Sequence, residues 1–368
     1  MSNNMRPLMK NFDLLLFGLT MIASVFGIIM VASVSGTMTN PYDYIITQSV
    51  ALALGLVCIY FIVALDYEYM AKFAYYLFGF SVFLLILVLI PGIGIKVNGA
   101  RRWMGVGSTT FQPSEFVKIF FIITFAAHLE QVERELNRPL NVMLLLAHVG
   151  IICALLLMQP DLGAALAFVT IFVIMIFLAG LSYKYIISAI VLFAAAAPAA
   201  WMWVLKDYQK NRIISFFNPE KFADEIGYHV VQSKIAVGSG QIFGKGLFGG
   251  ITQYYLPERH TDFIYAVIGE ELGFLGAIAI LALLLAIVLR CFYISQKAKN
   301  PLGRYISAGV AAMLLFQIVE NVGMCIGIMP VTGLTLPFIS YGGTSLMMNL
   351  IAVGLVLNVR CRYKVINF

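Results

Sequence analysis

The residues best suited to chemistry form a short polar run, Pro257-Glu258-Arg259-His260-Thr261-Asp262, directly before a long apolar stretch. Asp262 stands at the boundary between the two. An aspartate in that place can be the N-cap of the following helix. It can also be a general base at a membrane surface, where one carboxylate accepts a proton from a sugar hydroxyl. The spacing alone leaves both interpretations open.

Two segments outside the apolar stretches carry cations. The segment 91–113 holds Lys96, Arg101 and Arg102, and the longer segment 206–262 holds seven more cations, Lys206, Lys210, Arg212, Lys221, Lys234, Lys245 and Arg259. Such side chains can reach out to lipid phosphates at the interface. Alternatively, they form a site for a phosphorylated ligand. Trp103 is typical of an interfacial anchor, and it can also stack on a lipid or a sugar.

Several ionisable residues lie inside or beside apolar stretches, where each costs roughly 3 kcal/mol to insert. Glu115 and Lys118 are three residues apart on one helical face and can neutralise each other. They either form a structural ion pair or shape an adjacent outer site. Asp161 precedes a new helix and is expected to be its N-cap. Glu320 needs a polar partner, and the neighbours Glu270 and Glu271 point in different directions, so they cannot serve one site.

Other common sites find no support in the sequence. The five cysteines and four histidines show no metal-ligand spacing, and the cysteines are expected to be buried thiols. The stretch GKGLFG at 244–249 fits a dinucleotide pattern but lacks the strand–turn–helix context that the pattern needs. Hydrolase and nucleotide-driven motifs are missing as well.

The elements that position these residues must be membrane helices, because the chain is 61% hydrophobic and only 11% charged, with a mean hydropathy of +0.92. Its apolar runs are continuous, which excludes a β-barrel. We predict an all-α polytopic membrane protein that forms a single domain over 1–368. Ten spans of about 20 residues are expected, at 14–34, 44–65, 73–90, 115–129, 142–158, 162–181, 185–205, 263–289, 305–329 and 344–359.

Lys and Arg in the short loops set the orientation. They favour both termini inside and one large outer loop, 206–262, between the seventh and eighth spans. The cations of 91–113 and 206–262 then lie outside, against the general rule. Translocation of long loops is largely independent of charge, so the exception in the short segment 91–113 carries more weight.

A resemblance rests on motifs that run in order along nearly the whole chain. They are NGARRW (98–103), FQPSEFVK (111–118), QPDLGAA (159–165), VVQSKIAVGSG (230–240), YLPERHTDFI (255–264), EELG (270–273) and MPVTGLTLPFISYGGTS (329–345). The chain resembles the shape, elongation, division and sporulation family of bacterial peptidoglycan polymerases. Within it, QSKIAVGSG and MPVTG are more similar to the RodA branch than to the FtsW branch.

This resemblance implies an inverting glycosyltransferase of the bacterial cytoplasmic membrane that polymerises lipid II on the outer face, for cell elongation. The proposed base of the family falls on Asp262. The residues expected to bind substrate are Lys96, Arg101, Arg102, Trp103, Arg212, Lys234, Lys245, Glu258, Arg259, His260, Thr261 and Ser340. Those expected to support the site are Gln112, Ser114, Glu115, Lys118 and Asp161.

The resemblance also implies a divalent cation, Mg²⁺ or Mn²⁺, for which Asp262 is a possible ligand. It implies a class B penicillin-binding protein as partner, docked along spans near 305–359 and above the outer loops, together with other membrane proteins of the elongation complex and no nucleic acid. Two rivals are kept. A lipid II flippase would line a path with its in-span charges, and a non-catalytic scaffold would tolerate any change at Asp262.

Overall fold

The computed structural model describes residues 11–36, 38, 40–97, 100–106, 109–199, 201–202, 210, 214, 216, 226–251 and 255–363. Its helices are α2 (Leu14–Ser35), α3 (Pro41–Ala64), α4 (Tyr67–Lys72), α5 (Ala74–Leu89), α6 (Pro113–Val132), η1 (Glu133–Glu135), α7 (Pro139–Met158), α8 (Leu162–Leu178), α9 (Tyr183–Ala199), α11 (Ile226–Ser239), α12 (Ile264–Gln296), α13 (Pro301–Cys325) and α14 (Gly343–Cys361).

A helix occupies each of the ten ranges in which the sequence predicts a span. By length and apolarity, six of them can cross a membrane: α2, α3, α7, α12, α13 and α14. Two shorter helices, α5 and α8, are also apolar. The chain is therefore a multi-pass helical membrane protein, and the count of ten spans stays a prediction.

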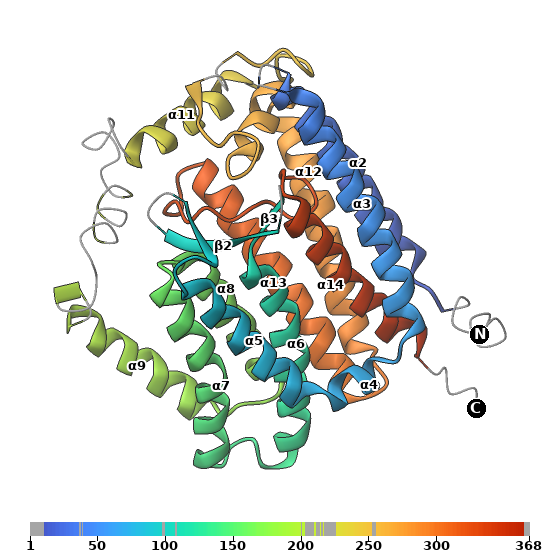
Figure 1. Cartoon of the computed structure of the whole chain (residues 1–368), viewed down its shortest axis with the longest axis vertical. Coiled ribbons are helices and arrows are strands. Elements are labelled where there is room, and N and C mark those ends of the chain that lie inside the picture. The colour runs from blue at the N-terminus through green and yellow to red at the C-terminus, as the bar shows by residue number, and fades with distance from the viewer. Residues whose placement is uncertain are drawn as a thin grey trace.

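The expectation of an all-α chain is wrong in one place. Between α5 and α6 lies a three-stranded antiparallel sheet of β1 (Gly94–Val97), β2 (Ala100–Val106) and β3 (Thr109–Phe111), in that order. The apolar runs that identify membrane helices are absent from this segment, so the sequence predicts a loop there. Its strands are short, and they depend on pairing with each other and on packing against α5 and α6. The sheet packs against α5 and α6, and Arg102 of β2 reaches Asp161 at the start of α8 (Figure 1).

The core of the bundle is formed by α13 and α14, whose most apolar windows are 78% and 72% buried, against 22% for α3. Close approach to this core requires small residues. A Cβ on Gly27 of α2 would overlap the backbone of Phe338 and Ile339, so α2 can pack against this segment only with glycine there. The segment between α13 and α14 is thereby held against the outer helices.

The helix α12 is broken at Gly273, whose φ of 68° and ψ of −169° suit glycine alone. The break leaves backbone groups without helical partners, and the 241–246 segment supplies them. The N–H groups of Lys245 and Gly246 donate to the carbonyls of Glu270 and Glu271, at 3.0 and 2.9 Å. In return, the N–H groups of residues 274 and 275 donate to the carbonyls of 241 and 242.

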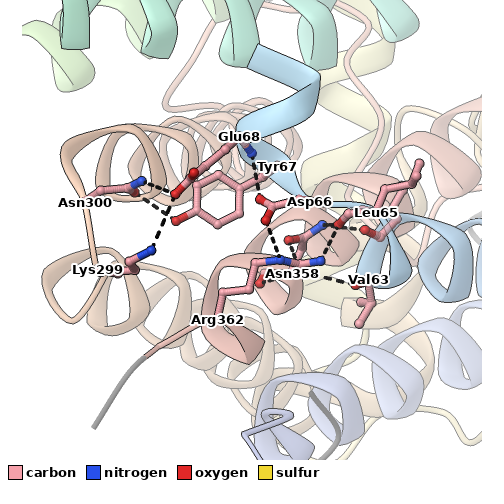
Figure 2. Close-up of polar contacts among 10 residues, drawn as sticks. Val63, Leu65, Asp66, Tyr67, Glu68, Lys299, Asn300, Asn358 and Arg362 are labelled. Atoms are coloured by element: carbon pink, nitrogen blue, oxygen red, sulfur yellow. Dashed lines mark hydrogen bonds and ion pairs between the residues drawn. The ribbon is translucent and has the colours of Figure 1, made fainter. Parts of the chain in front are cut away.

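At the end of the bundle predicted to face the cytoplasm, a polar network joins three segments (Figure 2). The Tyr67 hydroxyl of α4 donates to Asn300 Oδ1, and Asn300 Nδ2 donates to Glu68 Oε1. Asn300 also caps α13 through the Gly303 N–H. Arg362, just after α14, donates to the Leu65 carbonyl. The short helix α4 is thus fixed to the α12–α13 connection and to the end of α14.

The two ends of the described chain meet. The Asn11 side chain donates to the Tyr363 carbonyl at 3.2 Å, and Asp13 forms an ion pair with Arg290 at 2.8 Å and a longer one with Arg360 at 3.8 Å. This contact agrees with the prediction that both termini lie on one side of the membrane, without deciding which side.

Candidate active site

The polar run before α12 forms a tight turn around one carbonyl. Glu258 adopts a positive φ of 50°, and its carbonyl accepts the N–H groups of Thr261, Asp262 and Phe263 at 3.0–3.2 Å. The Thr261 hydroxyl adds a bond of 3.0 Å to Glu258 Oε2. The structure places the N-cap position of α12 at Phe263, one residue after Asp262.

Three consecutive carbonyls fasten this turn to the rest of the bundle. The His260 carbonyl accepts the Tyr341 N–H at 2.9 Å, and the Thr261 carbonyl accepts the Ser340 hydroxyl at 2.6 Å. The Asp262 carbonyl accepts Asn321 Nδ2 of α13 at 2.7 Å. Because the main chain of 260–262 is held by these bonds, the position of the Asp262 side chain is set by the backbone.

The Asp262 carboxylate faces Gly333. A Cβ at Gly333 would lie 3.2 Å from Asp262 Oδ2, closer than ordinary contact. Gly333 also has a φ of +77°, which L-residues with side chains rarely adopt. Both observations indicate that the open face of this glycine leaves room beside the carboxylate.

His260 lies in an aromatic pocket. Its ring meets Tyr44 of α3 edge-on at 5.4 Å between centroids and lies 5.5 Å from Tyr341. Burial lowers the pKa of His260 below its ordinary value of 6.5; Glu258 opposes this shift and Arg259 adds to it. The imidazole is therefore neutral at pH 7 and can offer a hydrogen bond to a ligand without adding charge.

A second polar cluster surrounds Asp161, which is 3% exposed. As predicted, Asp161 caps α8, with Oδ1 accepting the Ala164 N–H at 3.2 Å. Its Oδ2 accepts Gln112 Nε2 at 2.9 Å, and Arg102 of β2 lies 3.7 Å away. Three predicted site residues from three segments therefore meet here, with the positive charge of Arg102 balanced by Asp161.

The two clusters lie on either side of one dipeptide. A Cβ on Gly163, at the start of α8, would lie 3.1 Å from Thr332, while Gly333 faces Asp262. The Thr332 hydroxyl donates to Glu320 of α13 in a short bond, which gives Glu320 the polar partner that its place in a span requires. The segment 332–333 thus forms the wall shared by both clusters.

The predicted pair Glu115–Lys118 is present on α6. Lys118 Nζ lies 2.8 Å from Glu115 Oε1, and the two residues are 2% and 8% exposed. The preceding Ser114 is also buried. The pair satisfies both charges internally.

The sheet carries two cations that face each other, Lys96 and Arg101. Lys96 on β1 is directly opposite Arg101 on β2, and Trp103 is opposite Ile95. Like charges in facing positions repel each other. Within the part of the chain that the structure describes, neither Lys96 nor Arg101 forms an ion pair with a carboxylate. The two cations are therefore available to bind an anion together.

Other predicted cations serve different purposes. Lys245 Nζ forms an ion pair of 2.6 Å with Glu270, which is fully buried, so its charge is already neutralised. Lys234 of α11 extends over Gly327, where any Cβ would overlap its chain. Arg212 lies outside the described residues.

Sequence reasoning missed Gly333 and Asn321. Both lie in stretches that look like ordinary apolar or loop sequence, and neither ionises. Gly333 can be identified as a site residue only after the structure shows that its φ is positive. Asn321 follows Glu320 in an apolar helix. A buried side-chain amide needs hydrogen-bond partners, so its presence there could have indicated that it donates to backbone carbonyls.

The residues present fit a divalent cation in a limited way. Among the described residues, no group of three or more His, Cys, Asp or Glu side chains is placed to hold a metal ion. Mg²⁺ often keeps several waters and binds through one or two carboxylates together with substrate phosphates. Asp262 fits that arrangement as a single carboxylate ligand.

Comparison with known proteins adds a family and a fold. The family model of cell cycle proteins called FTSW_RODA_SPOVE matches residues 13–364. A probable peptidoglycan glycosyltransferase FtsW of Trichlorobacter lovleyi is 39% identical over 87% of this chain and 84% of its own length. The peptidoglycan glycosyltransferase MrdB of Escherichia coli is 35% identical over 86% of this chain and 85% of its own.

Solved structures share the fold over nearly their whole length. A chain from a study of how a peptidoglycan synthase complex coordinates polymerization and crosslinking aligns with a TM-score of 0.81 at 32% identity, covering 95% of this chain and 97% of that one. The rod shape determining protein RodA of Thermus thermophilus aligns with a TM-score of 0.72 at 32% identity, covering 96% and 97%.

Proposed function

This chain belongs to the FtsW/RodA/SpoVE family of cell cycle proteins, and from that premise we propose that it is a peptidoglycan glycosyltransferase that polymerises lipid II. The observation that carries the proposal is the placement of Asp262. The backbone of 260–262 is fixed by hydrogen bonds from Tyr341, Ser340 and Asn321, and the Asp262 carboxylate faces Gly333.

In the proposed reaction Asp262 is the general base. Its carboxylate takes the proton from the 4-hydroxyl of the acceptor sugar as that oxygen forms a bond to C1 of the donor. The bond from C1 to the diphosphate oxygen breaks, and undecaprenyl diphosphate leaves with the electron pair. The displacement inverts C1 and yields a β-1,4 link. Because a diphosphate leaves readily, one carboxylate suffices.

The leaving diphosphate needs positive charge beside it. Lys96 and Arg101 supply it best, because they face each other without a carboxylate partner among the described residues, whereas Arg102 and Lys245 are paired with Asp161 and Glu270. A divalent cation, Mg²⁺ or Mn²⁺, held by Asp262 and the substrate phosphates would supply further charge for the leaving group.

We place the reaction on the outer face of the cytoplasmic membrane, in cell-wall elongation, with a class B penicillin-binding protein as partner. The charge pattern of the loops supports the outer face. The motifs QSKIAVGSG and MPVTG and the RodA-like structure support elongation. The related synthase complex supports a cross-linking partner.

The test compares lipid II polymerisation by wild type, Asp262→Asn and Asp262→Ala, each purified with the partner and with the partner's transpeptidase blocked. We expect glycan strands from wild type and a loss of about 10²–10⁴-fold in both variants, the range that a general base contributes. Equal polymer from all three would remove Asp262 as the base. Lipid II transport across vesicles without polymer would favour a flippase.

The elongation role has its own readout in cells. Depleting the protein should give round cells that regain rod shape with wild type but not with Asp262→Asn. Long filaments on depletion would assign the enzyme to division.

A further inference from the structure

The loop that follows α11, residues 241–248, exposes large apolar side chains beyond what a water-facing loop normally carries. Phe243 is 80% exposed, Phe248 62% and Ile242 56%. A contiguous apolar surface of this kind marks contact with a protein or a membrane. The depth at which the loop is bonded to α12, relative to the membrane, distinguishes contact with a protein from contact with a membrane.

Two polar contacts between α2 and α12 mark the borders of the membrane. At one end Asp13 pairs with Arg290, and at the other the Ser33 hydroxyl donates to Glu271 at 2.6 Å. Residues 272–289 between the α12 markers contain no polar side chain. At 1.5 Å per residue the two markers on α2 are about 30 Å apart, which equals the thickness of the hydrocarbon core.

The loop is fastened at and below the outer of these borders. The carbonyls of Gln241 and Ile242 accept the N–H groups of Phe274 and Leu275, at 2.8 and 3.2 Å. Residues 274 and 275 lie three and four positions past Glu271, towards the membrane centre. The unbroken part of α12 from residue 274 to Arg290 spans about 24 Å at 1.5 Å per residue, so the start of the loop lies about 6 Å inside a core of about 30 Å.

The bonding of the loop suits that depth. Irregular backbone is tolerated at membrane depth only where its polar groups are satisfied by protein. Here the break at Gly273 and the loop satisfy each other through four backbone hydrogen bonds. Glu270 neutralises the ammonium group of Lys245, so this side chain of the loop brings no unpaired charge into the membrane.

We propose that residues 241–248 form a re-entrant loop in the outer leaflet, with Ile242, Phe243 and Phe248 in contact with phospholipid acyl chains. The loop connects α11 with the segment that leads to Asp262. It therefore anchors the outer part of the molecule to the bilayer at a fixed depth. This inference rests on the fold alone and is independent of the proposed reaction.

The experiment places the photo-reactive residue p-benzoylphenylalanine at position 243 of the full-length protein in phospholipid nanodiscs. Matched controls carry it at Leu275, which is exposed on α12 between the two polar markers, and at Glu135, in the charged η1 connection. After illumination, mass spectrometry counts phospholipid adducts. We expect a yield at 243 similar to that at Leu275 and several-fold above that at Glu135. A yield at 243 no higher than at Glu135 would overturn the proposal.

A second variant guards against local misfolding at 243. Phe248→Trp in nanodiscs should gain tryptophan fluorescence that phospholipids brominated on their acyl chains quench, relative to wild type in the same lipids. Quenching of the added fluorescence by aqueous acrylamide alone would show that the loop stands in water and would also refute the insertion.

Discussion

At the scale of single residues, the main finding is that Asp262 is positioned by groups that do not ionise. Asn321, Ser340 and Tyr341 hold the backbone of 260–262, and Gly333 faces the Asp262 carboxylate without a side chain. Several charged candidates of the sequence are paired, as with Asp161 and Arg102. Catalytic competence should therefore be sensitive to neutral substitutions near Asp262.

Gly333→Ala tests this sensitivity. The new Cβ would lie 3.2 Å from Asp262 Oδ2 on a backbone with φ of +77°, so the carboxylate must shift. We expect polymerisation to fall at least tenfold, because misplacement by about 1 Å can cost 10²-fold. The control Gly18→Ala, which meets nothing within 4 Å, should retain activity. Equal activity in both variants would show that the open face of Gly333 is not needed.

The protonation of His260 predicts a pH dependence of stability. Burial lowers the pKa of the folded-state imidazole below 6.5, so the unfolded state binds more protons as the pH falls through that range. Wild type should lose thermal stability from pH 7 to pH 5. His260→Gln should reduce this loss, measured by unfolding in detergent at each pH. A pH profile identical to that of wild type would contradict the assignment.

At the scale of elements, the break in α12 and the sheet between α5 and α6 position the site. The half of α12 before Gly273 starts at Ile264, two residues after Asp262, and its far end is clamped by the ion pair of Lys245 with the buried Glu270. The Ile251 N–H adds a bond of 2.9 Å to the same carboxylate. This clamp should contribute to stability because it neutralises a charge that is out of water.

The variant Lys245→Met tests the clamp. It leaves the Glu270 carboxylate without its cation, so unfolding in detergent should become easier by about 3 kcal/mol, near the low end of the cost of breaking a buried pair. The double variant Lys245→Met/Glu270→Gln removes both charges and should recover most of that loss. A double variant no more stable than the single one would contradict the electrostatic cause.

At the scale of the whole molecule, the ends of the described chain meet beside Asp13, and the outer segments gather around the start of α12. Reporter fusions test the orientation. A fluorescent protein fused after the last residue should fluoresce in the cytoplasm, whereas alkaline phosphatase inserted at Asn40, between the first and second predicted spans, should be active outside. The reverse pattern would invert the proposed topology and place Asp262 on the inner face.

Composition and loop charge determined the class of molecule, and a helix was found in each predicted range, because apolar runs and their lengths are local properties of a chain. Local spacing also predicted the Glu115–Lys118 pair and the Asp161 cap. The small sheet was not predicted, since its strands depend on pairing with each other and on packing against α5 and α6. Which cations are neutralised, what holds Asp262 and where Gly333 lies depend on residues far apart in sequence. Only the tertiary structure decided these points, because contacts between distant segments are set by how helices pack and leave no local pattern.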